Sequence, residues 1–190
     1  MIKKILLSSD PILRRKSKPV IKIDKKVLDL IHDLKDTLNV QKDPEGVGLA
    51  APQIGKNLRI FVAHYDQSPT GKSPGKNFER VVINPEIIKA EPEIEGSKTS
   101  KKGKSKHEIL EGCLSLPNYY GPLKRTPRIT LKYLNEKGEK MTETFEDFDA
   151  QIIMHEIDHL EGILFVDHLL EEKKPLYKVE DGEWEEVELI

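Results

Sequence analysis

The feature that most constrains the fold of this chain is its only cysteine, Cys113, together with the segment HEIDH at residues 155–159. Two histidines four residues apart lie on one face of a helix, so both imidazoles can reach the same ion. A cysteine and two histidines leave one coordination position open for water, which is what a catalytic metal site requires. The fold must therefore bring Cys113 against the helix that carries His155 and His159.

Glu156 follows the first histidine and flanks the ligand face of that helix, where a metal-bound water would sit. A divalent ion lowers the pKa of such a water from 15.7 in bulk towards about 7. A carboxylate in hydrogen-bond reach can take the proton from this water and return it to a leaving amine. The segment therefore predicts metal-assisted hydrolysis with Glu156 as general base.

A third segment, GVGLAAPQ at residues 46–53, precedes the other two, and with it the chain resembles a peptide deformylase. The three signature segments of that family, GVGLAAPQ, EGCLS at residues 111–115 and HEIDH, occur in order. The resemblance implies removal of the formyl group from the N-terminal formyl-methionine of newly made polypeptides, with release of formate. It also implies that the metal ligands are Cys113, His155 and His159, and that the oxyanion is stabilised by the side-chain amide of Gln53 and the backbone N–H of Leu114.

Substrate contacts are expected at two places. The backbone of Gly46, Val47 and Gly48 permits an extended peptide to add alongside as a strand, because glycine allows close approach. By positional match, the resemblance lines an apolar methionine pocket with Val47, Phe148 and Ile152, and with Gln151 as a polar departure. A formyl carbon carries only hydrogen, so a cramped site beside the metal would admit it and exclude an acetyl group.

Two other positions depart from the family pattern. Met154 stands where many members have Gln, and Tyr120 stands where many bacterial members have Arg. A substrate contact by an arginine is therefore not carried over to this chain.

The cofactor implied by the resemblance is one Fe²⁺ per chain, for which Zn²⁺, Ni²⁺ or Co²⁺ would substitute. The ligand types alone suit zinc equally well.

Two alternative functions remain open. A metalloendopeptidase of the HExxH type would take a third ligand downstream, such as Glu180 or Glu183. A non-catalytic metal-binding module would use the same ligands to hold its fold, and Glu156 would be dispensable.

Local periodicity predicts the main elements. Val27, Ile31, Leu34 and Leu38 form one apolar stripe of a helix over residues 24–40, with Asp24 as N-cap. Strands are predicted at residues 59–63, 80–85, 128–134 and 141–145, with a terminal hairpin formed by residues 176–179 and 184–189. Strands that precede a helix without regular alternation predict an α+β fold, in which mostly antiparallel β-sheets pack around a C-terminal helix carrying HEIDH.

Two charged residues near the motif receive structural interpretations. Asp158 faces away from the ligand stripe, so we expect it to form an ion pair with an arginine such as Arg125. Glu161 is interpreted as a surface charge on an exposed helix face.

The 190 residues predict a single catalytic domain over residues 1–190, with flexible polar insertions near residues 66–77 and 95–106. A formal net charge of −2 gives no reason to expect DNA binding. The apolar runs are too short for a membrane span or a signal peptide. Because a lone thiolate ligand is safest in a reducing compartment, we expect a cytoplasmic protein. Its expected partners are N-formylmethionyl nascent polypeptides.

The insertion at residues 98–106 is rich in lysine. We favour a solvated loop without a partner. The alternative is contact with ribosomal RNA through its phosphates. The acidic C-terminal tail does not carry the basic helix through which some deformylases bind the ribosome, so that docking mode is not expected here.

Overall fold

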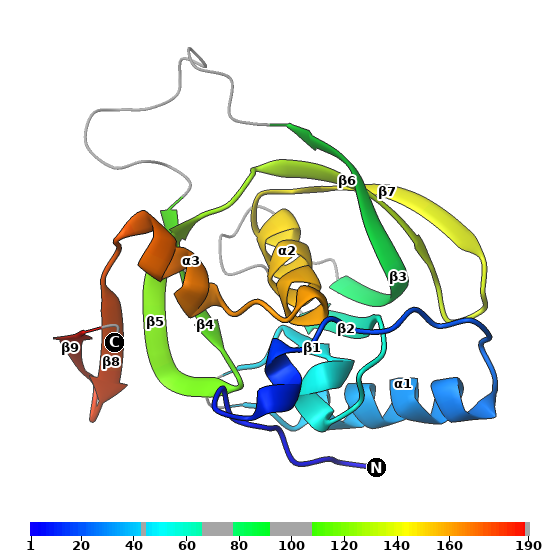
Figure 1. Cartoon of the computed structure of the whole chain (residues 1–190), viewed down its shortest axis with the longest axis horizontal. Helices are drawn as coiled ribbons and strands as arrows, with labels where there is room; N and C mark the ends of the chain where they lie inside the picture. The colour runs from blue at the N-terminus through cyan, green and yellow to red at the C-terminus, as the bar shows by residue number, and fades with distance from the viewer. Residues whose placement is uncertain (43–44, 66–77, 92–107, 189–190) are drawn as a thin grey trace.

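The computed structural model describes residues 1–42, 45–65, 78–91 and 108–188 (Figure 1). Both predicted insertions, residues 66–77 and 95–106, lie outside this part of the chain. The fold is α+β with two antiparallel sheets, as predicted. The first sheet contains, in spatial order, β1 (Gly48–Ala50), β2 (Ile60–Tyr65), β3 (Phe78–Glu91), β6 (Arg128–Leu134) and β7 (Lys140–Glu146). The second contains β4 (Glu108–Cys113), β5 (Leu116–Lys124), β8 (Leu176–Glu180) and β9 (Glu183–Val187).

Helix α1 (Lys25–Asn39) covers one face of the first sheet. It begins as predicted at Asp24, whose Oδ1 accepts a hydrogen bond from the N–H of Val27 at 3.1 Å. Its apolar stripe packs in one cluster with Ile60 and Val62 of β2. The prediction of this helix is confirmed.

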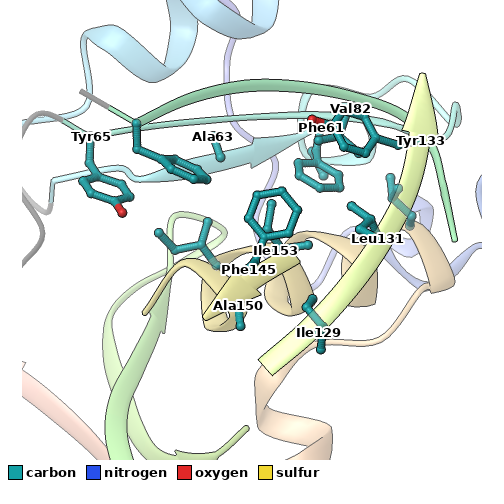
Figure 2. Packing of buried hydrophobic residues seen from close by; sticks show 14 residues of the cluster. Phe61, Ala63, Tyr65, Val82, Ile129, Leu131, Tyr133, Phe145, Ala150 and Ile153 are labelled. Carbon is teal, nitrogen blue, oxygen red and sulfur yellow. The ribbon is translucent and has the colours of Figure 1, made fainter. Parts of the chain in front are cut away.

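Helix α2 (Asp147–Glu161) packs against the other face of the same sheet and carries the HEIDH segment. Phe61 and Ala63 of β2 meet Ala150 and Ile153 of α2 in a buried cluster (Figure 2). Because β2 is buried on both faces, its sequence IFVAHY is nearly continuously apolar. The helix with the histidines is therefore held by a rigid core.

The second sheet lies on the other side of α2 (Figure 1). Helix α3 (Phe165–Glu172) packs on this sheet through Phe165 and Leu169, which form a core with Leu123 and Leu176. The motif helix is thus followed by a further helix and by the predicted terminal hairpin β8–β9, so it is not the last element of the chain. Strands β4 and β5 and helix α3 were not predicted from the sequence.

Two 3₁₀ helices complete the described elements. One spans Pro11–Arg14, and the other spans Ala51–Ile54 and contains Gln53. Within the described residues, no helix is both long enough and apolar enough to span a membrane.

Candidate active site

The end of α2 is fixed by Gly162. This residue has φ 78°, in the left-handed region, and its N–H donates to the carbonyls of Asp158 and His159. A Cβ at this position would lie 2.8 Å from the backbone of Arg14, so only glycine fits. The last turn, which carries His159, therefore has a defined position against the N-terminal segment.

Three possible metal ligands meet between α2 and the second sheet. Cys113 ends β4, and its Sγ lies 3.2 Å from Nε2 of His159. One donor atom each from Cys113, His155 and His159 lie within 4.8 Å of one another. A thiolate and two imidazoles are a typical ligand set for a catalytic divalent ion. The donor set that the sequence singled out is thus brought together by the fold.

Glu111 determines which nitrogen of His155 faces this group. Its Oε1 lies 2.6 Å from Nδ1 of His155, so Nε2 is left for the side of Cys113. Orientation of a ligand histidine by a carboxylate is common in metal sites, where it also raises the basicity of the ring. Residues two apart on a strand share a face, so the spacing of Glu111 and Cys113 was a signal that could have identified this role.

The pKa values of Cys113 and His155 show that the cysteine is held as a thiolate, the form that favours metal binding. Burial raises the pKa of Cys113, but the neighbouring His159 and His155 lower it more, and the net pKa is well below the usual value. Burial lowers the pKa of His155, but Cys113 and Glu111 raise it well above its usual value. The thiolate is the form that binds a metal, and a bound ion would displace the proton of His155.

Glu156 is buried beside the ligands, with 3% of its surface exposed. Burial raises the pKa of this carboxyl to about 7, although the two histidines act in the opposite direction. Its Oε2 has no hydrogen-bond partner among the described residues. Burying a carboxylate oxygen without a hydrogen-bond partner costs free energy, so such an atom is expected where water or a ligand supplies the partner. Glu156 therefore fits a site that binds water or substrate.

Gly48 makes room for Glu156. A Cβ on Gly48 would overlap the Glu156 carboxylate. Strand β1, which contains Gly48, is an edge strand of the first sheet. The glycine-rich segment therefore lies directly against the acidic group.

The side chain of Gln53 is fixed from both ends. Its Oε1 accepts a hydrogen bond from the N–H of Ala50 at 2.8 Å, and its Nε2 donates to Ser115 Oγ at 3.2 Å. The same Nε2 lies 3.6 Å from Cys113 Sγ. Since a backbone N–H can pair only with the amide oxygen, the NH₂ group must point towards the site. Gln53 is therefore a preorganised donor rather than an ordinary loop residue.

These groups line one pocket of about 360 Å³. Except for His159, which lies buried with 1% of its surface exposed, all of the residues predicted for the site line it. They are Gly46, Val47, Gly48, Gln53, Cys113, Leu114, Phe148, Gln151, Ile152, His155 and Glu156. The wall also contains Glu45, Leu110, Glu111, Gly112 and Tyr120, which the sequence analysis did not assign to the site.

A partly buried ion-pair network supports the wall of the pocket. Nη2 of Arg125 lies 2.6 Å from Glu111, and Nη1 lies 2.7 Å from Asp158, so the predicted Asp158–Arg125 pair is confirmed. His168 adds a contact of 2.8 Å to Asp158. Burial raises the pKa of Glu111, but His155 and Arg125 lower it to well below its usual range. Gln151 donates to the same carboxylate at 3.3 Å, which accounts for its polar side chain.

One interpretation was wrong. Glu161 is not a free surface charge, because its carboxylate is partly buried and pairs with Arg59 and Lys16. Its exposed fraction is 28%. The pairs connect the end of α2 to segments that are distant in the sequence.

The N-terminal segment connects the two sides of the site. The N–H of Leu6 donates to the carbonyl of Gln53 at 2.8 Å, and the N–H of Ser8 donates to the carbonyl of Ser115 at 2.7 Å. These contacts could not be predicted from residue types, because they join backbone groups. By contrast, Glu180 and Glu183, the alternative third ligands, are exposed at the turn of the terminal hairpin and are not part of the ligand group.

Comparison with known proteins gives a consistent result. A family model described as polypeptide deformylase matches residues 2–175. A peptide deformylase from Pseudothermotoga lettingae is 42% identical over 167 residues, which cover 88% of this chain and 82% of that protein. A crystal structure of a peptide deformylase from Legionella pneumophila has a TM-score of 0.69 and 38% identity, covering 88% of this chain and 85% of that chain. A Met-Ala-Ser-bound class I type b peptide deformylase from Acinetobacter baumannii has a TM-score of 0.71 and 30% identity, covering 88% of this chain and 98% of that chain.

Proposed function

The chain belongs to the peptide deformylase family, and we propose a mechanism by which its pocket removes the N-formyl group from newly made polypeptides. The observation that carries the mechanism is the position of the buried Glu156 carboxylate. It lies in the same pocket as the ligand group and as the fixed amide of Gln53. The endopeptidase and the structural metal module are not favoured, because the relatives that cover most of the chain are named peptide deformylases.

Cys113, His155 and His159 would hold the metal. Thiolate and imidazole donors fit Fe²⁺ and also Zn²⁺, Ni²⁺ or Co²⁺, and we propose Fe²⁺ as the ion in the cell. A divalent ion bound there would act as a Lewis acid on the formyl carbonyl and make a water molecule more acidic. Glu111 would keep Nε2 of His155 available for that ion.

Glu156 would move the protons of the reaction. It accepts a proton from water as the water oxygen attacks the formyl carbon. The C–N bond then breaks, and Glu156 delivers the same proton to the leaving nitrogen, which leaves formate and a peptide with a free amino group. A carboxylate whose pKa burial has raised to about 7 is suited to both transfers.

Gln53 and Leu114 would stabilise the oxyanion. The Gln53 NH₂ is directed at the site because the N–H of Ala50 holds the amide oxygen. Leu114 follows the ligand Cys113 directly and lines the pocket, so its backbone N–H is the second proposed donor. Such preorganised donors act on charge that develops in the transition state.

The substrate would lie as an added strand between two sheet edges. β1 is an edge strand of the first sheet and β4 is an edge strand of the second, and both contribute to the pocket. An extended peptide could pair with the backbone of Gly46, Val47 and Gly48. The N-terminal methionine side chain would enter the apolar part lined by Val47, Phe148 and Ile152, with Gln151 at its polar side. A relative from Acinetobacter baumannii was crystallised with Met-Ala-Ser.

Partners and compartment follow from this activity. The substrates are formylated nascent polypeptides, and we propose that the protein acts in the cytoplasm as one domain over residues 1–190. For residues 98–106, the favoured solvated loop and the alternative of ribosome contact both stay predictions, because this insertion lies outside the described residues. Deleting it should leave activity on a short formyl peptide intact. Reduced co-sedimentation with ribosomes that depends on salt would favour contact, and equal co-sedimentation at low and high salt would favour a plain insertion.

Formate release tests the proposed function. The protein is purified anaerobically, its metal content is measured, and it is assayed with formyl-Met-Ala-Ser and with the unformylated Met-Ala-Ser. We expect formate from the first peptide and no peptide-bond cleavage of either. Cys113→Ala should lose both metal and activity. Unchanged metal content in Cys113→Ala would remove this residue from the ligand set.

A further inference from the structure

The first turn of α2 carries Phe148, which lines the pocket. The first N–H groups of a helix need partners, and the side chain of the N-cap residue commonly supplies one. In α2 the side chain of the N-cap residue, Glu146, makes no such hydrogen bond. The position of Phe148 therefore depends on contacts that other elements make with this turn.

Tyr65, the last residue of β2, makes two such contacts. Its ring meets the ring of Phe148 edge to face, with centroids 5.6 Å apart and planes at 65°. Its hydroxyl donates a hydrogen bond to Oδ1 of Asp149, the next residue of the helix. Tyr65 is buried, and it is not among the residues that line the pocket. It therefore supports Phe148 from the side of the core.

The ring of Tyr65 is itself fixed by its neighbours. Tyr65 pairs with Phe78 across strands β2 and β3, and the two rings stack with centroids 5.0 Å apart. The guanidinium of Arg80 lies over the Phe78 ring, 5.1 Å from its centroid, and the centroid of the Phe145 ring lies 6.2 Å from the same ring. Rings packed in this way leave little room for another orientation. Tyr65 is thus a rigid support for the first turn of α2.

The carboxylate of Asp149 needs this hydrogen bond. Asp149 is partly buried, and burial raises its pKa more than the bond from Tyr65 lowers it. Removing the hydroxyl would leave a partly desolvated carboxylate without this donor, which costs free energy. We therefore expect the side chain of Asp149 to turn towards solvent in Tyr65→Phe, and the turn that carries Phe148 to move with it.

We propose that Tyr65 is a positioning residue for the methionine pocket, which holds Phe148 in place through its ring and through its hydrogen bond to Asp149. This inference rests on the proposed function, because it concerns the part of the pocket that takes the methionine side chain. Neither Tyr65 nor Asp149 lines the pocket, so both act on the substrate through Phe148.

The effect should fall on the choice of the first residue of the substrate. An apolar pocket distinguishes side chains that differ by one methylene by about 10- to 200-fold. Methionine is unbranched and leucine is branched, so a displaced Phe148 should reduce the preference for methionine over leucine. Both contacts of Tyr65 lie in the first turn of α2, about two turns before Glu156, so kcat for the methionine peptide should change little.

Tyr133→Phe is the matched control. Tyr133 and Tyr65 are both 4% exposed and belong to the same core cluster, at whose opposite ends Figure 2 shows them. The hydroxyl of Tyr133 donates to the carboxylate of Glu143 at 2.8 Å, on β7 rather than on α2. Both variants therefore lose a hydrogen bond from a buried tyrosine to a carboxylate, but only Tyr65→Phe loses one to the turn that carries Phe148.

Kinetics of the anaerobically purified holoenzymes test the inference, with formyl-Met-Ala-Ser and formyl-Leu-Ala-Ser as substrates. We expect the methionine preference, the ratio of the two kcat/KM values, to fall about 3- to 10-fold in Tyr65→Phe, mainly through a higher KM for the methionine peptide. Asp149→Ala should behave in the same way. Asp149→Asn keeps an acceptor for the hydroxyl and should keep the preference, as should Tyr133→Phe.

A double-variant cycle tests whether Tyr65 acts through Phe148. In the Phe148→Ala background, Tyr65→Phe should cause no further loss of the methionine preference. An unchanged preference in Tyr65→Phe, or an equal loss in Tyr133→Phe, would overturn the inference, because the role of Tyr65 would then be only structural. The wild type keeps these outcomes separate from the proposed function. If the wild type released no formate from formyl-Met-Ala-Ser, the proposed function itself would be wrong.

Discussion

Oε1 of Glu111 on β4 lies 2.6 Å from Nδ1 of His155 on α2. This contact joins the second sheet to the helix that packs on the first sheet. It orients a candidate metal ligand with a carboxylate that Arg125 holds in place from the other side. The geometry of the ligand group thus depends on a buried ion pair as well as on the apolar core.

We predict that Glu111→Gln weakens metal binding about 10- to 100-fold, because the charged partner of His155 is lost. Asp158→Asn is the matched control, since it removes the other carboxylate of Arg125 but does not touch His155. Metal affinity of both variants is measured by competition with a chelator. Equal affinities for wild type and Glu111→Gln would show that Glu111 does not support the ligand.

Gly48→Ala should displace Glu156, because the new Cβ would occupy the position of its carboxylate. A displacement of about 1 Å costs on the order of 10²-fold in rate, and metal content should stay unchanged. The double variant Gly48→Ala, Glu156→Ala is the control. If Gly48 acts through Glu156, the double variant should be no slower than Glu156→Ala alone. A further large loss in the double variant would contradict this.

Gln53→Ala should lower kcat by about 10²- to 10³-fold with little change in KM, since an oxyanion donor acts mainly in the transition state. Gln53→Glu separates the two ends of the side chain. It keeps an acceptor for the N–H of Ala50 but removes the donor that faces the site. We expect it to lose kcat as well. A change in KM alone would make Gln53 a substrate-binding residue.

The partly buried pairs of Glu161 predict a pH-dependent stability. Burial raises the pKa of Glu161, but Lys16 and Arg59 lower it more, so the net pKa is lowered. A lowered pKa contributes stability that is present above the unfolded pKa of about 4.3 and is lost as the pH falls through the folded value. Glu161→Gln should therefore lower Tm by about 2–4 °C at pH 7.

That difference in Tm should shrink towards zero in acid, below the pKa of the folded protein. Glu172→Gln is the control, because its carboxylate is 41% exposed where it pairs with Lys174. The Tm of Glu172→Gln should equal that of the wild type both at pH 7 and in acid. A Tm difference for Glu161→Gln that is the same at pH 7 and in acid would contradict the assigned pairs.

Elements with a local signal could be predicted from the sequence. The stripe and N-cap of α1 and the alternation of β6 are properties of short segments, and both elements were found with nearly the predicted bounds. The terminal hairpin was also found, since the Asp181-Gly182 turn signals it locally. The spacing of His155 and His159 is likewise a property of a short helical segment, so the sequence could predict that both histidines belong to one metal site.

Elements that depend on tertiary pairing were missed. β5 contains Pro117, Gly121 and Pro122, which disfavour a strand, and it forms because it pairs with β4 and β8. The interpretation of Glu161 failed because its partners lie far away in the sequence. The fixed orientation of Gln53 likewise arises from the 3₁₀ turn in which it lies, which a loop-like sequence does not reveal.

The measurement that tests the central claim most directly is formate release by Glu156→Ala, with metal content determined on the same anaerobic sample. Glu156 is proposed as the general base and is not one of the three grouped ligands. The variant should keep the metal content of the wild type and lose about 10²- to 10⁴-fold in kcat. Full activity with a full complement of metal would contradict the mechanism.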